Sequence, residues 1–82
     1  MISVDIYVPS VDATYDFQLD ENAAIKKIVL EISGMISRKV KWQGPIHSEL
    51  FSLYEFEQGE ELFREETLSS YGIQDGDRLM LV

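Results

Sequence analysis

The sequence contains no cysteine and only one histidine, His47, among its 82 residues. Without cysteine the chain forms no disulfide, has no thiolate ligand for zinc and has no thiol nucleophile. His47 lies in a polar loop close to a proline, where a solvated histidine is far more common than a catalytic base. The carboxylates do not follow the spacing of a calcium-binding loop, and the glycines form no phosphate loop. We therefore expect a protein that is not an enzyme and that holds no cofactor and no metal.

Long apolar runs are missing as well. No stretch approaches the roughly 20 apolar residues that a membrane-spanning helix needs. The first eight residues, MISVDIYV, have no basic region and carry Asp5 within their apolar run, unlike a signal peptide. The sequence thus predicts a soluble, cytoplasmic protein that does not insert into a membrane.

Basic residues are scarce, with 7 against 15 acidic ones and a formal net charge of −8. Because phosphate binding needs a basic surface, this balance argues against nucleic acid as a partner. Most of the basic residues fall between positions 26 and 41, and glutamates crowd positions 49–66. This pattern describes either two solvated faces of opposite sign or a dipolar surface that orients a partner or a second copy. The basic cluster consists of Lys26, Lys27, Arg38, Lys39 and Lys41.

The first half of the chain predicts a β-hairpin followed by a helix. Apolar residues alternate over positions 2–8 and again up to Leu19, with a turn at positions 9–12 between them. After Leu19 the period changes to that of an amphipathic helix. Asn22 is the expected N-cap and Gly34 the expected left-handed residue at the helix end, with an extension of the helix through Met35 and Ile36 as the alternative. The helical stripe consists of Ile25, Ile28, Val29, Ile32 and Ile36.

The second half predicts a loop over positions 37–48, a third strand from Leu50 to Phe56 and a short strand at positions 62–63. The third strand is apolar on both sides, so its facing stays open. A helical turn at positions 69–71 ends at Gly72, and a last strand covers positions 78–82. The order β-β-α-β-β predicts one α+β domain over residues 1–82. In it a mixed sheet packs on one helix, and the last strand lies parallel to the first in the middle of the sheet.

The segment LFREETLSSYGIQDGDRLMLV, from Leu62 to Val82, is similar without a gap to the end of ubiquitin. The shared features are the leucine, Thr-Leu-Ser, the tyrosine, Ile-Gln and the final Leu-x-Leu-Val. The chain thus resembles the ubiquitin-like proteins of β-grasp fold. The resemblance implies that the hydroxyl of Tyr71 pins the preceding loop, and it implies a set of core residues: Leu68, Ile73, Leu79 and Leu81.

Within that fold the chain looks most like the YukD-type proteins of bacterial type VII (WXG) secretion. The features are its length, the two lysines at positions 26–27 and the GDRL of positions 76–79. The resemblance implies an accessory protein that acts by binding protein partners, such as membrane-complex subunits, or by forming a homodimer. No Gly-Gly tail follows Val82, so we expect a module that is not conjugated. Two alternatives remain: a modifier or sulfur carrier whose tail is missing here, and a ubiquitin-like scaffold domain of a larger protein.

Candidate binding residues follow from the same match. Phe56, Met80 and Val82 occupy the outward positions of the binding patch on the sheet of ubiquitin, and exposed apolar clusters tend to be interfaces. A bulge that turns Phe56 inward is the alternative. Trp42 is a second candidate, which either caps the helix end over the core or anchors a partner or a dimer from its loop.

Overall fold

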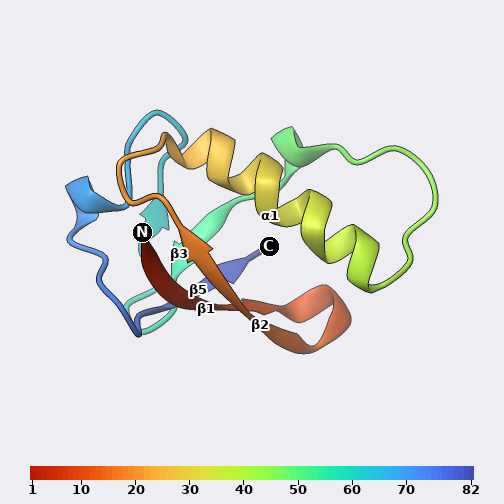
Figure 1. The fold of residues 1–82 in the computed structure, drawn as a ribbon, viewed down its shortest axis with the longest axis horizontal. Coiled ribbons are helices and arrows are strands. Elements are labelled where there is room, and N and C mark those ends of the chain that lie inside the picture. The colour runs from red at the N-terminus through yellow and green to blue at the C-terminus, as the bar shows by residue number, and fades with distance from the viewer.

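One long helix lies across a five-stranded mixed sheet in the computed structural model, which describes residues 1–82 (Figure 1). The sheet has the strand order β2-β1-β5-β3-β4. β1 pairs antiparallel with β2 and parallel with β5, and β3 pairs antiparallel with both β5 and β4. The α+β prediction is confirmed. The elements are β1 (Ile2–Val8), β2 (Ala13–Leu19), α1 (Ile25–Lys39), β3 (Leu53–Glu55), β4 (Glu61–Leu62) and β5 (Arg78–Leu81).

Strand β5 occupies the centre of the sheet, as predicted. Leu79 stands opposite Ile6 of β1, and Leu81 stands opposite Leu53 of β3. Beyond the strand, the backbone N–H and C=O of Val82 each bond to Ser52, at 2.9 Å. The strand is therefore paired on both sides over Arg78–Met80, and on the β3 side the hydrogen bonds continue to Val82.

The core fills the space between α1 and the inner face of the sheet. It consists of 16 buried apolar residues that form one cluster. The strands contribute alternate residues because successive side chains of a strand point to opposite faces, and the helix contributes the predicted stripe. Leu68, Ile73, Leu79 and Leu81 are all buried, as the resemblance implied. The hydroxyl of Tyr71 accepts a hydrogen bond from the backbone N–H of Phe63 at 3.0 Å.

The predicted N-cap of the helix is wrong. The cap position is Ala24, which has no side-chain hydrogen bond to the helix. Carbonyl groups of another segment cap the helix instead, since the N–H groups of Ile25 and Lys26 donate to the carbonyls of Glu66 and Arg64, at 2.8 and 3.0 Å. The Asn22 side chain is occupied elsewhere and accepts a hydrogen bond from the Ser69 hydroxyl.

The helix also ends later than predicted. It continues through Gly34 to Lys39, so positions 37–39 are not part of a loop. Burial of Ile36 explains this, because the apolar contacts of another turn outweigh the roughly 1 kcal/mol that glycine costs inside a helix. The end is a Schellman motif in which Lys41 takes the left-handed conformation usual for glycine, with φ of 56°. Its diagnostic hydrogen bond joins the N–H of Trp42 to the Ser37 carbonyl at 2.8 Å.

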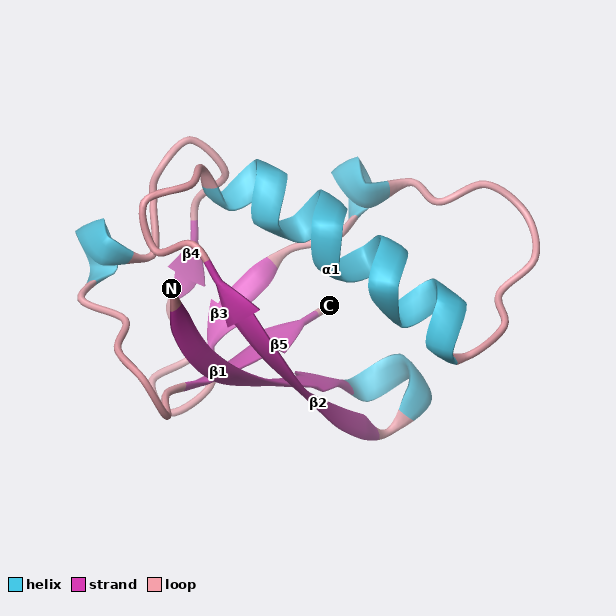
Figure 2. Cartoon of the chain, viewed as in Figure 1, coloured by secondary structure: helices cyan, strands magenta, loops and turns pink.

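The third and fourth strands differ from the prediction at their ends. β3 begins at Leu53 because positions 48–50 form a 3₁₀ turn (Figure 2), in which the N–H of Phe51 donates to the Ser48 carbonyl. β4 lies one residue earlier than expected. The 3₁₀ turn at positions 69–71, which ends at Gly72 with φ of 72°, is as predicted. No helix has the length and apolar character needed to cross a membrane.

Candidate functional site on the outer face of the sheet

The strands turn a second set of side chains away from the helix. Along β5, Leu79 and Leu81 are buried, whereas Arg78 is exposed and Met80 partly exposed. Val82 follows the same alternation with 55% of its surface exposed. Met80 and Val82 therefore lie on the outer face of the sheet.

Aromatic residues surround Met80 on this face. The register places Met80 opposite Tyr7 of β1 and opposite Tyr54 of β3, and both tyrosines are partly exposed. Side chains opposite one another in a sheet lie close enough to contact. We name the resulting surface the outer patch; it consists of Tyr7, Tyr54, Phe56, Met80 and Val82.

Phe56 faces outward, so the alternative of an inward bulge is wrong. Its side chain is 38% exposed, and its ring meets the Tyr7 ring edge to face with centroids 6.1 Å apart. The guanidinium of Arg78 lies 5.3 Å from the Phe56 ring centroid, a cation–π contact. The open facing of the third strand is thereby resolved: Leu53 points into the core, and Tyr54 and Phe56 point away from it.

A depression of about 420 Å³ lies at the Phe56 end of the outer patch, lined by Asp5, Tyr7, Thr14, Phe56 and Arg78. The Tyr7 hydroxyl donates a hydrogen bond to the Asp12 carboxylate at 3.0 Å. This bond, with smaller effects from partial burial and from the Asp12 charge, raises the pKa of Tyr7 above its ordinary value. The hydrogen bond holds the Tyr7 ring in place at the edge of the depression.

Sequence reasoning missed Tyr7, Tyr54 and Arg78 as members of this site. The signal for Tyr7 was present, because the alternation that buries Val4 and Ile6 places Tyr7 on the other face. A signal for Tyr54 was present as well, because it lies two residues before Phe56 and a strand turns both to the same face. Its place beside Met80 follows from pairing between distant segments.

Trp42 lies away from the outer patch, beyond the end of α1. Its side chain is 60% exposed, so it does not cap the core, and its indole N–H donates to the Pro45 carbonyl at 3.3 Å. Trp42 borders a cavity of about 410 Å³ between the second half of α1, the turn at positions 9–11 and residues 42–51. We name it the helix-end groove. Its main apolar lining residues are Val11, Ile36, Val40, Trp42, Ile46 and Leu50.

Comparison with solved structures shows what the chain is similar to. It superimposes on Caldiarchaeum subterraneum ubiquitin with a TM-score of 0.74 and 20% identity, covering 98% of this chain and 89% of that one. The N-terminal ubiquitin-like domain of the 4931431F19Rik protein gives a TM-score of 0.72 and 23% identity, covering 99% of this chain and 72% of the other. ATBAG1, crystallised in complex with HSP70, gives a TM-score of 0.77 and 17% identity, covering all of this chain but only 40% of that one.

No model of a protein family matches the sequence, and no curated protein matches it. At these identities the structural likeness concerns the fold, which can be shared by proteins of different function. It agrees with the strand order, the single helix and the central last strand described above. The chain has a ubiquitin-like β-grasp fold.

Proposed function

We propose that this protein is a protein-interaction module that binds its partner through the outer patch. The observation that carries the proposal is the aromatic and methionine surface around Met80, which stays partly exposed although the other face of the sheet supplies a complete core. Tyrosine and arginine are among the residue types that dominate binding energy at interfaces, and phenylalanine and methionine are enriched there. Arg78 beside Phe56 adds a charge that orients an acidic partner.

The partners we propose are membrane-complex subunits of a type VII secretion system, with the protein acting in the cytoplasm as an accessory component. The support is the resemblance to YukD-type proteins, above all the GDRL of positions 76–79. Gly76 has φ of 86°, a conformation that favours glycine, and the residue two positions later is Arg78, which contacts Phe56 of the outer patch. The motif thus includes a residue that borders the outer patch. The structural neighbour ATBAG1, seen in complex with HSP70, is a further case of a similar fold in a protein that binds another protein.

The gene neighbourhood tests the proposed pathway most cheaply. Genes for small WXG-type substrates and for an FtsK-like ATPase beside this gene would support it. A neighbourhood without any secretion component would contradict the pathway and leave the proposed binding surface untouched.

Two variants test the binding surface: Phe56→Glu and Met80→Glu. The probe is the cytoplasmic domain of each membrane-complex subunit encoded beside the gene, titrated by calorimetry. Each variant places a charge in the middle of the outer patch, so we expect affinity to fall at least about tenfold. The thermal midpoint should change little because neither side chain belongs to the buried cluster.

The matched control is Gln18→Glu, which adds the same charge at an exposed position of the edge strand β2. It should bind like wild type. Undiminished binding by both patch variants would contradict the proposal. A large and equal loss of stability in both would show that these side chains belong to the core.

A further inference from the structure

The two ends of α1 carry surfaces that complement each other and that the outer patch does not use. The helix-end groove lies at the carboxyl end of the helix. The loop after β4 lies at the amino end, where the carbonyls of Arg64 and Glu66 accept hydrogen bonds from the first helical N–H groups. With 15 residues at about 1.5 Å each, the helix separates the two ends by roughly 20 Å.

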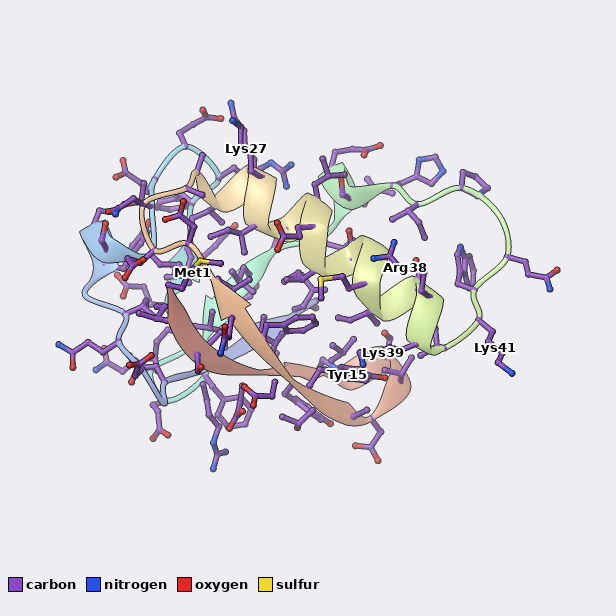
Figure 3. The ribbon with its side chains drawn as sticks, in the orientation of Figure 1. Met1, Tyr15, Lys27, Arg38, Lys39 and Lys41 are labelled. Atoms are coloured by element: carbon purple, nitrogen blue, oxygen red, sulfur yellow. The ribbon has the colours of Figure 1, made fainter.

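The lining of the groove is mainly apolar, and three basic residues adjoin its lining residues Ser37, Val40 and Trp42 in the sequence. Arg38, Lys39 and Lys41 lie on and just after the last turn of α1, and Lys41 extends into solvent (Figure 3). None of the three forms an ion pair. Lys39 rests its ammonium 5.8 Å from the centroid of the Tyr15 ring. Glu49, next to the lining residue Leu50, lies 3.4 Å from the Nδ1 atom of His47. The groove therefore suits an apolar side chain that carries negative charge around it.

The other end presents such a side chain. Phe63 is 60% exposed, and the segment GEELFREE of positions 59–66 surrounds it with four glutamates. Its backbone is held by the hydrogen bond from its N–H to the Tyr71 hydroxyl, and its neighbour Leu62 is buried. Arg64, the one cation in the segment, turns its guanidinium toward the carbonyls of Ser48 and Phe51, at 3.5 and 3.4 Å. Lys26, at the start of α1, is already paired with Glu65 at 3.2 Å.

We propose that copies of this chain associate head to tail, with Phe63 of one copy in the helix-end groove of the next. The glutamates around Phe63 would then lie near the basic end of α1, which carries Arg38, Lys39 and, just beyond it, Lys41. Since the donor and acceptor surfaces differ and lie at opposite ends, the contact is heterologous and extends into a chain unless the rotation closes a ring. A single aromatic anchor buries little area, so the association is weak and appears only as concentration rises.

Sedimentation velocity on the purified protein tests this proposal. We expect the wild-type sedimentation coefficient to rise between about 10 μM and 1 mM at low salt, the range of weak association. The rise should shrink strongly at about 1 M salt, where the Debye length is only about 3 Å. Trp42, the chain's one tryptophan, lines the groove and reports its occupation by a change in fluorescence.

Two variants disable one surface each: Phe63→Ser removes the anchor, and Trp42→Glu places an acid in the groove. Each alone should associate at least about tenfold more weakly than wild type. Mixed in equal amounts, they should form a heterodimer that does not extend, because each supplies the surface that the other lacks. Leu30→Ser is the matched control, since Leu30 is also 60% exposed but belongs to neither surface. Circular dichroism tests whether each variant is folded. If Trp42→Glu does not fold, Leu50→Glu is used in its place, because Leu50 also lines the groove.

Several results would overturn the inference. Wild-type protein that stays monomeric at about 1 mM would overturn it. This outcome includes the case in which the groove binds only a different partner. Association that persists in Phe63→Ser assigns the contact to another surface. Loss of association in Met80→Glu but not in Phe63→Ser assigns it to the outer patch. That result defeats head-to-tail assembly and leaves the outer patch as a proposed binding surface.

Discussion

Leu79 and Met80 are adjacent residues of β5 whose side chains lie on opposite faces of the sheet, and truncating each in turn tests the structure directly. Leu79 is fully buried between neighbours on both sides, Ile6 in β1 and Glu55 in β3. A central strand has little freedom to shift into a cavity. We therefore expect Leu79→Ala to lower the free energy of unfolding by about 3–4 kcal/mol, within the range for buried leucine.

Met80 lies on the outer face and is partly exposed. Its contacts there are cross-strand pairs with Tyr7 and Tyr54, and such pairs contribute at most about 1 kcal/mol each. Met80→Ala should therefore lower the free energy of unfolding by about 2 kcal/mol or less. A domain of this length has a total of about 4–12 kcal/mol, so the leucine variant loses a large share and the methionine variant a smaller one.

Urea unfolding followed by circular dichroism measures both losses. With a slope of about 1 kcal/mol per molar urea for a small domain, the midpoint should fall by about 3–4 M for Leu79→Ala and by less than about 2 M for Met80→Ala. Equal shifts would refute the assignment of the two side chains to different faces. A larger loss for Met80 than for Leu79 would mean that the strand register is displaced by one residue.

Two further predictions concern hydroxyl groups. Tyr71→Phe removes the hydroxyl that accepts the hydrogen bond from the Phe63 N–H. We expect the free energy of unfolding in urea to fall by about 0.5–1.5 kcal/mol and hydrogen exchange at the Phe63 amide to become faster. An unchanged exchange rate would contradict this prediction. In the folded state the pKa of Tyr7 is raised above 10.0 because its hydroxyl donates a hydrogen bond to Asp12. The neutral form of Tyr7 therefore stabilises the folded state below pH 10. This stabilisation is lost as the pH rises through the folded pKa. Urea midpoints should therefore fall less steeply above pH 10 for Tyr7→Phe than for wild type, and parallel curves would speak against the hydrogen bond.

The order and type of the elements could be predicted from the sequence because local patterns agree with global packing. Alternation over positions 2–8 buries Val4 and Ile6, and the helical stripe buries residues up to Ile36. The central place of β5 was also predictable, since a crossover by one helix brings a parallel strand beside the first. These signals depend on burial, which sets the pattern of apolar residues directly.

The helix ends could not be predicted because distant segments decide them. Asn22 is a good N-cap by its chemistry, yet its side chain bonds to Ser69 and the helical N–H groups bond to the loop after β4. Gly34 is a common end signal, yet burial of Ile36 carries the helix past it. In both cases a tertiary contact outweighs a local preference of about 1 kcal/mol.

The candidate site was predictable only in part for the same reason. Alternation alone places Met80 and Val82 on the outer face, but their neighbours depend on which strands flank β5. Tyr54 and Tyr7 join the outer patch because β3 and β1 flank that strand. Trp42 was a candidate by its chemistry, and its groove exists because the helix extends to Lys39 and the 3₁₀ turn at positions 48–50 folds back beside it.

The two proposed surfaces lie on different sides of the core, so one molecule can use both at once. The outer patch covers the face of the sheet that points away from α1, and the helix-end groove lies beside α1 itself. A head-to-tail chain of copies would therefore present its outer patches as a repeated array. When one copy in such an array has bound a partner with several binding sites, the next copy binds the same partner intramolecularly. This raises avidity without any new contact. If the proposed partner displays several binding sites, weak self-association would be sufficient, because such a partner would supply the local concentration that the groove requires.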